Sequence, residues 1–175
     1  DMNERTHARL GLEAELQRAY DEREFVLHYQ PRVGSGLADV RSLEALIRWQ
    51  RPGHGLVAPG QFIDVLEQMD LMTRVGEWVL RTACTQLREW HDQGHLHVGV
   101  SVNVAARQLE QADFAQMVNR VITDTGVDPR SVELELTESA LIARTEHAGR
   151  MLSALRAKGL RVAIDDFGTG YASLT

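Results

Sequence analysis

RVAIDDFGTGY, residues Arg161–Tyr171, joins an apolar strand to two adjacent carboxylates and a glycine-rich loop. Carboxylates at the end of a buried strand cost free energy unless a partner neutralises them, and the usual partner is a cation. In α/β proteins the strand ends face the cleft in which the chemistry takes place. The stretch therefore predicts an α/β fold with a cation-binding cleft at Asp165 and Asp166.

The segments that precede this stretch alternate between strand and helix patterns. Strands are expected at His97–Val104, Val132–Thr137 and Val162–Asp165, and helices at Ala112–Thr125 and Ala140–Lys158. Successive strands follow one another at intervals of about 30 residues, the length of one strand–helix unit. Such regular alternation is typical of a parallel sheet that is covered by helices.

The first half of the chain is less regular. Its expected elements are a helix at Asn3–Asp21, strands at Phe25–Val33 and Val40–Trp49, and helices at Pro59–Asp70 and Thr73–Gln93. The turn residues of Pro52–Gly55 end the second strand. Gly94 and Gly159 each follow a helix and are expected to end it.

The first helix begins on charged residues without a start signal of its own, which is the pattern of a helix that arrives from another domain. We therefore expect a linker helix from an upstream domain at residues 1–24 and one folded domain at residues 25–175. A chain of 175 residues is long enough to bury one sizeable core.

Composition narrows the classes of partner. The formal net charge is −6, and no basic stripe is present in the sequence, which argues against DNA as a ligand. The single cysteine, Cys84, excludes an internal disulfide and suits a reducing compartment. No apolar run approaches the ~20 residues of a membrane helix, and the N-terminus has no signal-peptide pattern. We expect a cytoplasmic domain without a membrane segment.

Each expected strand has an aliphatic face and a face with small or polar side chains, because side chains alternate along a strand. The polar faces carry one oxygen ligand each: Glu44, Asn103, Glu135 and Asp165. In a (β/α) barrel these faces point inward, so the oxygen ligands converge. The alternative is a sheet with one solvated face, but parallel strands are usually covered on both sides.

Three carboxylates and an amide without basic residues to match them repel one another when buried. A hard divalent cation removes this conflict, and all-oxygen ligand sets favour magnesium, manganese or calcium over zinc. Asp166, which follows Asp165 directly, is placed to bridge a second ion. Arg48 shares the polar face of its strand with Glu44.

Several short motifs occur in a fixed order along the chain. They are Tyr29-Gln30-Pro31, Glu44-Ala45-Leu46-Ile47-Arg48-Trp49, Pro59 with Phe62-Ile63, Ser101-Val102-Asn103-Val104, Glu135-Leu136-Thr137-Glu138, and Asp165-Asp166-Phe167-Gly168-Thr169-Gly170-Tyr171. In this order the motifs resemble those of the bacterial EAL domain family, which are TIM-barrel-like phosphodiesterases of the second messenger cyclic di-GMP. The resemblance covers the chain from Phe25 onward.

The resemblance implies a role for each matching acidic position. Glu44, Asn103, Glu135 and Asp165 match the metal ligands of the family, and Asp166 matches the carboxylate that serves a second metal ion. The implied cofactors are two divalent cations, Mg²⁺ or Mn²⁺. Two such ions can activate a water and brace an in-line displacement at phosphorus, with Glu44, Asp165 and Asp166 as the catalytic residues.

The resemblance also implies substrate contacts and partners. Arg48 matches the arginine that holds a substrate phosphate, and Gln30 lines the same pocket. Glu138 matches a glutamate that steadies the loop after Asp166, which in the family affects both metal binding and dimerisation. The implied substrate is cyclic di-GMP, the product is the linear dinucleotide pGpG, and the implied neighbour in the chain is a sensory or cyclase domain.

A full (β/α) barrel needs ~200–250 residues, and only five strands can be assigned in this chain. The lysine, glutamate and glutamine that the family carries on later strands have no counterpart before Thr175. We therefore expect a C-terminally incomplete domain, inactive as a 175-residue piece. The alternative function is a receptor that binds cyclic di-GMP without cleaving it; because the assigned ligands are intact, the enzyme is favoured.

Overall fold

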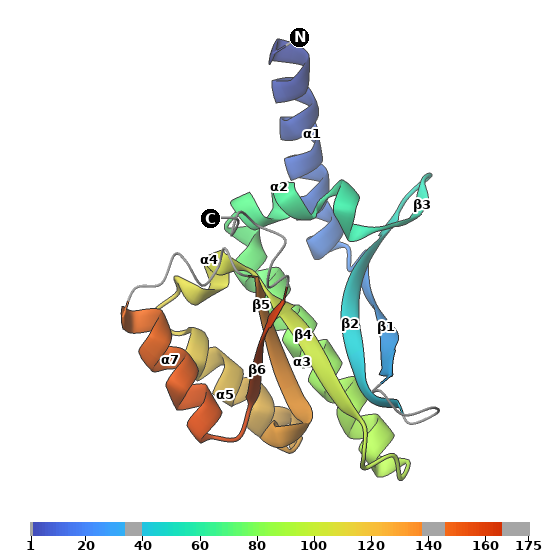
Figure 1. Ribbon diagram of the computed structural model, residues 1–175. Coiled ribbons are helices and arrows are strands. Elements are labelled where there is room, and N and C mark those ends of the chain that lie inside the picture. Colours follow the sequence, from blue (N-terminus) through green and yellow to red (C-terminus); the bar gives the residue numbers. More distant parts are fainter. Residues whose placement is uncertain (1, 34–39, 138–145, 166–175) are drawn as a thin grey trace, which may run out of the picture.

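The computed structural model describes residues 2–33, 40–137 and 146–165 (Figure 1). Two residues with predicted roles, Asp166 and Glu138, lie outside these ranges, as does the first part of the helix expected at Ala140–Lys158. Asp165 lies inside them, but only its backbone is described.

A six-stranded sheet forms the centre of the molecule, in the order β1-β2-β4-β5-β6, with β3 paired to β2. Its strands are β1 (Phe25–Val33), β2 (Val40–Arg51), β3 (Gly55–Val57), β4 (Gly99–Val104), β5 (Val132–Thr137) and β6 (Arg161–Asp165). β1 runs antiparallel to β2, and the pairs from β2 to β6 are parallel. The expected parallel sheet is therefore confirmed, with an antiparallel strand at one edge.

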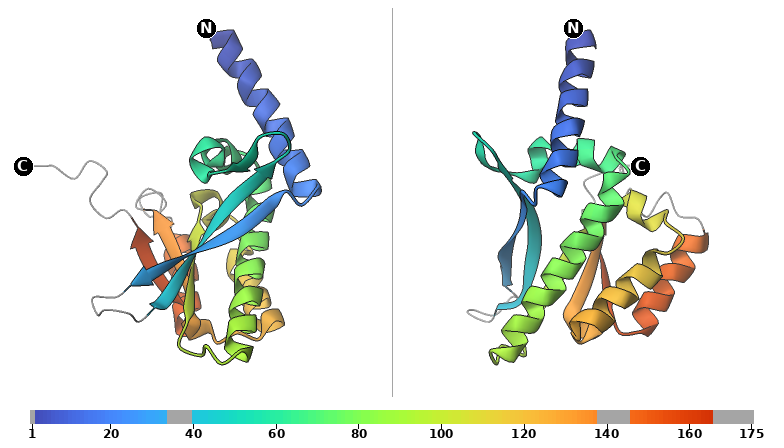
Figure 2. Two further views of the ribbon diagram at one scale, coloured as in Figure 1. Left: turned by 90° about the vertical axis from the view of Figure 1, so that its right-hand side faces the viewer. Right: turned by 180° about the vertical axis from the view of Figure 1, so that it is seen from behind.

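The helices are α1 (Met2–Asp21), α2 (Ile63–Gln68), α3 (Leu71–Asp92), α4 (Ala106–Leu109), α5 (Phe114–Thr125) and α7 (Glu146–Ala157). Figures 1 and 2 show α3, α5 and α7 side by side against one face of the sheet. No helix among the described residues has the length and apolar character needed to cross a membrane. The layered arrangement leaves the opposite face of the sheet for polar side chains.

The structure differs from the expected elements in three main respects. The single helix expected at Pro59–Asp70 is divided into a 3₁₀ turn, Pro59–Gln61, and α2, because Phe62 leaves helical geometry with φ −142°. The turn at Pro52–Gly55 does end β2, at Arg51, but the chain then folds back as β3, which was not expected. The short α4 directly after β4 was not expected from the sequence.

Glycine ends two helices as expected. Gly94 follows α3 with φ 96° and Gly159 follows α7 with φ 101°. These are left-handed conformations that glycine adopts without the steric cost of a side chain. Both helices can therefore turn back toward the strand that comes next.

The aliphatic faces of the strands form the core beneath the helices. Val100 of β4 and Val132, Leu134 and Leu136 of β5 are all fully buried. Burial of each such side chain contributes about 1.5–3 kcal/mol relative to exposure. The predicted division of each strand into an apolar and a polar face is thus confirmed for β4 and β5.

The last turns of α1 also belong to this core. Leu16 and Ala19 are fully buried, and Arg51 of β2 holds Glu15 through two hydrogen bonds of 2.9 and 3.0 Å. Figure 1 shows the first turns of α1 extending away from the body of the molecule. Packing thus fixes the C-terminal part of α1 to the sheet, while its beginning projects outward.

Cys84 provides a test of this packing. The residue is fully buried on α3, and burial raises the pKa of its thiol to about 12. Because only the thiolate reacts, we expect the native protein at pH 8 to resist a thiol reagent and to react promptly once unfolded in denaturant. The raised pKa also makes the free energy of unfolding depend on pH. The neutral buried thiol contributes fully to this free energy below the unfolded thiol pKa of ~8.5, and the contribution is lost as pH rises above that value.

A disulfide reagent that releases a coloured thiolate when it reacts with cysteine is used, and the absorbance of that thiolate measures the reaction. The variant Cys84→Ala supplies the background, because the chain has no second cysteine. Stoichiometric labelling of the native protein within minutes contradicts the position of Cys84 in the core.

Candidate functional site

Strand pairing brings the predicted oxygen ligands onto neighbouring positions of the polar face. Asn103 of β4 lies opposite Glu135 of β5, and Glu44 of β2 lies opposite Ser101 of β4. The backbone of Asp165 pairs with Thr137, one strand further along the sheet. The parallel register therefore places Glu44, Asn103 and Glu135 on adjacent strands, as the alternation of side chains predicts.

The three side chains are joined by hydrogen bonds rather than merely facing the same way. Asn103 Nδ2 donates to Glu44 Oε1 at 2.9 Å. Arg32 Nη2 donates to Glu44 Oε2 and to Glu135 Oε2, each at 2.8 Å, and Arg32 Nη1 also donates to Glu135 Oε1. One guanidinium thus holds two carboxylates from two different strands. We call Arg32, Glu44, Asn103 and Glu135 the carboxylate cluster.

Arg32 corrects the sequence analysis, which found no basic residue to match the carboxylates. The residue lies on β1 opposite Ser42 of β2, two positions after Gln30 and hence on the same strand face. The alternation of side chains along β1 was the signal by which Arg32 could have been placed beside the carboxylates. It could not be used, because the antiparallel pairing of β1 with β2 was not part of the expected topology.

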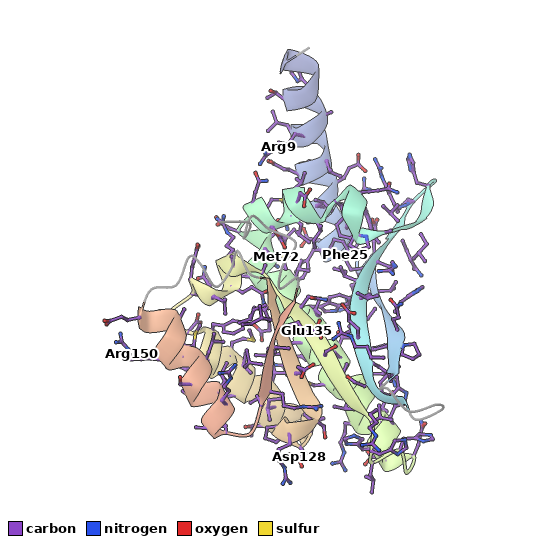
Figure 3. All side chains as sticks on the ribbon, in the orientation of Figure 1. Arg9, Phe25, Met72, Asp128, Glu135 and Arg150 are labelled. Carbon is purple, nitrogen blue, oxygen red and sulfur yellow. The ribbon has the colours of Figure 1, made fainter. Side chains whose placement is uncertain are left out.

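Glu135, on β5, is the buried member of the cluster (Figure 3). Only 2% of the residue is exposed. Burial raises the pKa of Glu135 above its usual range, although the Arg32 guanidinium opposes that shift. Burial alone would lower the pKa of Arg32, but its hydrogen bonds to Glu44 and Glu135 raise it. The ion pair therefore offsets part of the cost of burying the carboxylate.

The cluster suits a hard cation. Within the described ranges no three His, Cys, Asp or Glu side chains gather closely enough to form a metal site by themselves. Glu44 and Glu135 nevertheless converge on one positively charged group, the Arg32 guanidinium. Asn103 adds a neutral amide, whose nitrogen donates to Glu44 and whose oxygen can serve as a ligand. Carboxylate and amide oxygens are the ligands that Mg²⁺ and Mn²⁺ prefer, so the donor set fits a divalent cation.

A cavity of about 340 Å³ opens beside Glu44 and Asn103. Its walls are largely apolar and come from β2, α2 and α3, with Leu46 and Ile63 among them. Glu67 of α2 also lines it, and burial raises the pKa of this carboxyl group. An apolar cavity next to convergent polar groups is typical of a small-molecule site.

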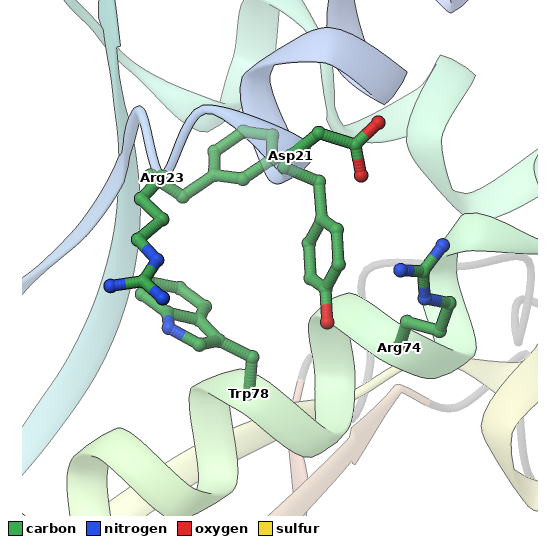
Figure 4. Close-up of a pocket in the computed structure, with 6 residues that line it drawn as sticks. Asp21, Arg23, Arg74 and Trp78 are labelled. Carbon is green, nitrogen blue, oxygen red and sulfur yellow. The ribbon is translucent and has the colours of Figure 1, made fainter.

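Another cavity, of about 510 Å³, has a different character (Figure 4). It is lined by Tyr20, Asp21, Arg23, Phe25, Arg74 and Trp78. The Arg74 guanidinium stacks 4.5 Å from the centre of the Tyr20 ring. This cavity contains no member of the carboxylate cluster and only one acidic residue, so it lacks the ligands that cation chemistry needs.

The predicted substrate residues lie near the cluster without joining it. Gln30 is opposite Glu44 in the β1–β2 pairing, and its side chain is exposed. Arg48 lies on β2, four residues after Glu44. Its Nη1 donates to the Ile47 carbonyl at 2.8 Å. The structure thus places both residues on the two strands that carry Arg32 and Glu44.

Comparison with known sequences gives a consistent result. The profile described as EAL domain matches residues 13–175. The chain is 39% identical over 173 residues to the bifunctional diguanylate cyclase/cyclic di-GMP phosphodiesterase MucR of Pseudomonas aeruginosa, covering 99% of this chain and 25% of that protein. It is 37% identical over 175 residues to the cyclic di-GMP phosphodiesterase PdeR of Escherichia coli, covering 100% of this chain and 26% of that protein. The chain therefore spans about a quarter of the length of these relatives.

Solved structures share the fold. A structure titled PaMucR phosphodiesterase, c-di-GMP complex, superposes with a TM-score of 0.87 at 39% identity, covering 93% of this chain and 66% of that one. The EAL enzyme Bd1971, in a form titled cAMP and cyclic-di-GMP bound, superposes with a TM-score of 0.90 at 31% identity, covering 97% of this chain and 47% of that one.

Asn103→Asp tests the electrostatics of the carboxylate cluster. The variant replaces the donor to Glu44 with a third carboxylate, so we expect the metal-free protein to lose about 1 kcal/mol of stability at pH 7. Chemical denaturation measures this loss. Acidification toward pH 4 should reduce the difference, because protonation removes the repulsion between the carboxylates.

Asn119→Asp, on α5 and outside the carboxylate cluster, is the control with the same charge change. An Asn103→Asp variant that is as stable as this control at pH 7 contradicts the hydrogen-bonded cluster.

Proposed function

Because this chain belongs to the EAL domain family, we propose that it forms part of a cyclic di-GMP phosphodiesterase that hydrolyses one phosphodiester bond and releases linear pGpG. The observation that carries the proposal is the convergence of Glu44, Asn103 and Glu135 on one face of the sheet. Relatives named as cyclic di-GMP phosphodiesterases support the choice of substrate.

We assign the metal ligands from the same cluster. Glu44, Asn103 and Glu135 hold the cation together with Asp165, and Asp166 serves a second cation. When bound, the two divalent cations, Mg²⁺ or Mn²⁺, lower the pKa of a water and neutralise charge that develops on the phosphate. The buried position of Glu135 excludes bulk water from its carboxylate, which strengthens its attraction for a cation.

The remaining residues bind and orient the substrate. Arg48 supplies a bidentate guanidinium for a phosphate oxygen pair, and Gln30 contacts the substrate from β1. The apolar cavity beside Glu44 receives the uncharged part of the ligand. Asn103 holds Glu44 in place through its amide hydrogen bond.

The wider arrangement is proposed on the same basis. Glu138 anchors the loop after Asp166, and this loop supports a homodimer contact. Residues 1–24 link the domain, residues 25–175, to an upstream sensory or cyclase domain, which fits the outward course of the first turns of α1. The reduced thiol of Cys84 fits a cytoplasmic location.

A receptor that binds cyclic di-GMP without cleaving it is the second candidate. The observation that favours it is the ion pair of Arg32 with Glu44 and Glu135. A guanidinium in this position pairs with both carboxylates without a metal ion, and a protein that binds the ligand without cleaving it has no need of the metal. Turnover separates the two candidates.

Glu44→Ala tests the enzyme proposal in the natural full-length protein with Mg²⁺ or Mn²⁺. We expect the rate of pGpG formation, followed by chromatography, to fall by about 100-fold or more, because a metal ligand is lost. Glu89→Ala, at an exposed position of α3, is the control and should keep full activity. Unchanged turnover in Glu44→Ala contradicts the metal assignment, and tight binding with no turnover by the unmodified protein supports the receptor.

Arg48→Lys tests the phosphate contact. Lysine keeps the charge but cannot form a bidentate pair, so we expect KM for cyclic di-GMP to rise about 10-fold. Steady-state kinetics at saturating metal measure the change, with Arg120→Lys on α5 as the matched control. A KM equal to that of the control removes Arg48 from the substrate site.

A further inference from the structure

Arg32 is the residue of the carboxylate cluster to which the proposed phosphodiesterase activity gives no role. Its guanidinium donates to both oxygens of Glu135 and to one oxygen of Glu44. The side chain of Glu135 is 1% exposed, whereas that of Arg32 is 39% exposed. Arg32 therefore reaches from the solvent side of the sheet to a carboxylate that is otherwise removed from water.

The contact is a charged pair with a specific geometry rather than a loose surface interaction. Arg32 comes from β1, Glu44 from β2 and Glu135 from β5, so one guanidinium links three strands. Asn103 occupies the remaining oxygen of Glu44. A buried carboxylate left without such a partner is strongly destabilising. In the absence of another cation, Arg32 therefore stabilises the fold by pairing with Glu135.

The oxygens that accept from Arg32 are also the oxygens that the proposed metal ligands must offer. Each of these three oxygens accepts one hydrogen bond from the guanidinium, and a cation bound to them would bring a second positive charge into the same space, where the two charges repel each other. Arg32 and a divalent cation are thus alternative partners for Glu44 and Glu135. The Arg32 side chain is 39% exposed, so its guanidinium has a path toward solvent when it is displaced.

We propose that Arg32 is an internal counter-cation that holds Glu44 and Glu135 when no metal is bound and that a divalent cation must displace to enter the site. Arg32 is a positioning residue that sets the metal concentration at which the site fills. The inference rests on the proposed function, since it takes Glu44 and Glu135 as metal ligands. It adds that the metal concentration needed to fill the site depends on Arg32 as well as on the metal ligands.

The direction of the effect follows from competition. When the ligands of a site are paired with another group for most of the time, only a fraction of the protein can bind the cation. The apparent Kd for the cation is then the intrinsic Kd divided by that fraction, so binding is weaker. Removing the competing guanidinium therefore strengthens metal binding. A purely structural Arg32, one that pre-arranges the carboxylates for metal, gives the opposite sign, because its loss weakens binding.

The experiment compares Arg32→Gln with the unmodified natural full-length protein, both stripped of metal with a chelator. Isothermal titration calorimetry with Mn²⁺ alone, without substrate, should give a Kd that is about 10-fold lower in Arg32→Gln. The Tm of the metal-free variant should fall below that of the unmodified protein, and saturating Mn²⁺ should close the gap. Arg81→Gln, which removes a surface ion pair to Asp124, is the control and should leave Mn²⁺ affinity unchanged.

Arg32→Lys covers the case in which Arg32→Gln does not fold without metal. Lysine keeps the positive charge but lacks the forked donors, so it competes less well for the two carboxylates. The Mn²⁺ affinity of Arg32→Lys should therefore lie above that of the unmodified protein. An Mn²⁺ affinity that is unchanged or weaker in the folded Arg32 variants overturns the inference.

Glu44→Ala in the same titration separates this inference from the proposed function. If Glu44→Ala binds Mn²⁺ as tightly as the unmodified protein, the metal assignment itself fails, and the inference fails with it. If Glu44→Ala weakens Mn²⁺ binding while Arg32→Gln does not strengthen it, only the competition by Arg32 is wrong.

Discussion

A carboxylate buried on an inner strand of the sheet is the constraint on which the rest of the site depends. Glu135 is 2% exposed, and a lone charge at such a position destabilises the fold. The chain meets this constraint with Arg32, more than a hundred positions earlier in the sequence, whose guanidinium also engages Glu44. The edge strand β1 is thus tied to the inner strand β5 by charge as well as by the sheet between them.

The architecture makes this arrangement possible because the two faces of the sheet are treated differently. Helices α3, α5 and α7 cover the aliphatic face (Figure 2), where Leu134 and Leu136 are fully buried. The polar face is left for Glu44, Asn103 and Glu135. Parallel register aligns these residues across neighbouring strands. The same alternation of side chains therefore builds both the core and the site.

Alternation was also what the sequence revealed best. The bounds of β1 and β5, the apolar faces of β4 and β5, and the adjacency of Asn103 and Glu135 all follow from period-two patterning and strand spacing. The small hairpin strand β3 and the break at Phe62 depend on local backbone geometry that composition does not specify. Arg32 depended on knowing which strand pairs with β2, and that is a tertiary fact rather than a local one. Asp166 and Glu138 lie outside the described residues, so their assigned roles remain predictions.

The central claim is that Glu44, Asn103 and Glu135 form a cation site in which Arg32 and a divalent metal exclude each other. Anomalous X-ray diffraction from crystals of the natural protein grown with Mn²⁺ tests it most directly. The account predicts an Mn²⁺ peak in contact with oxygens of all three residues, with the Arg32 guanidinium no longer bonded to Glu44 and Glu135. A peak elsewhere, or a metal bound at the cluster while Arg32 keeps both ion pairs, contradicts it.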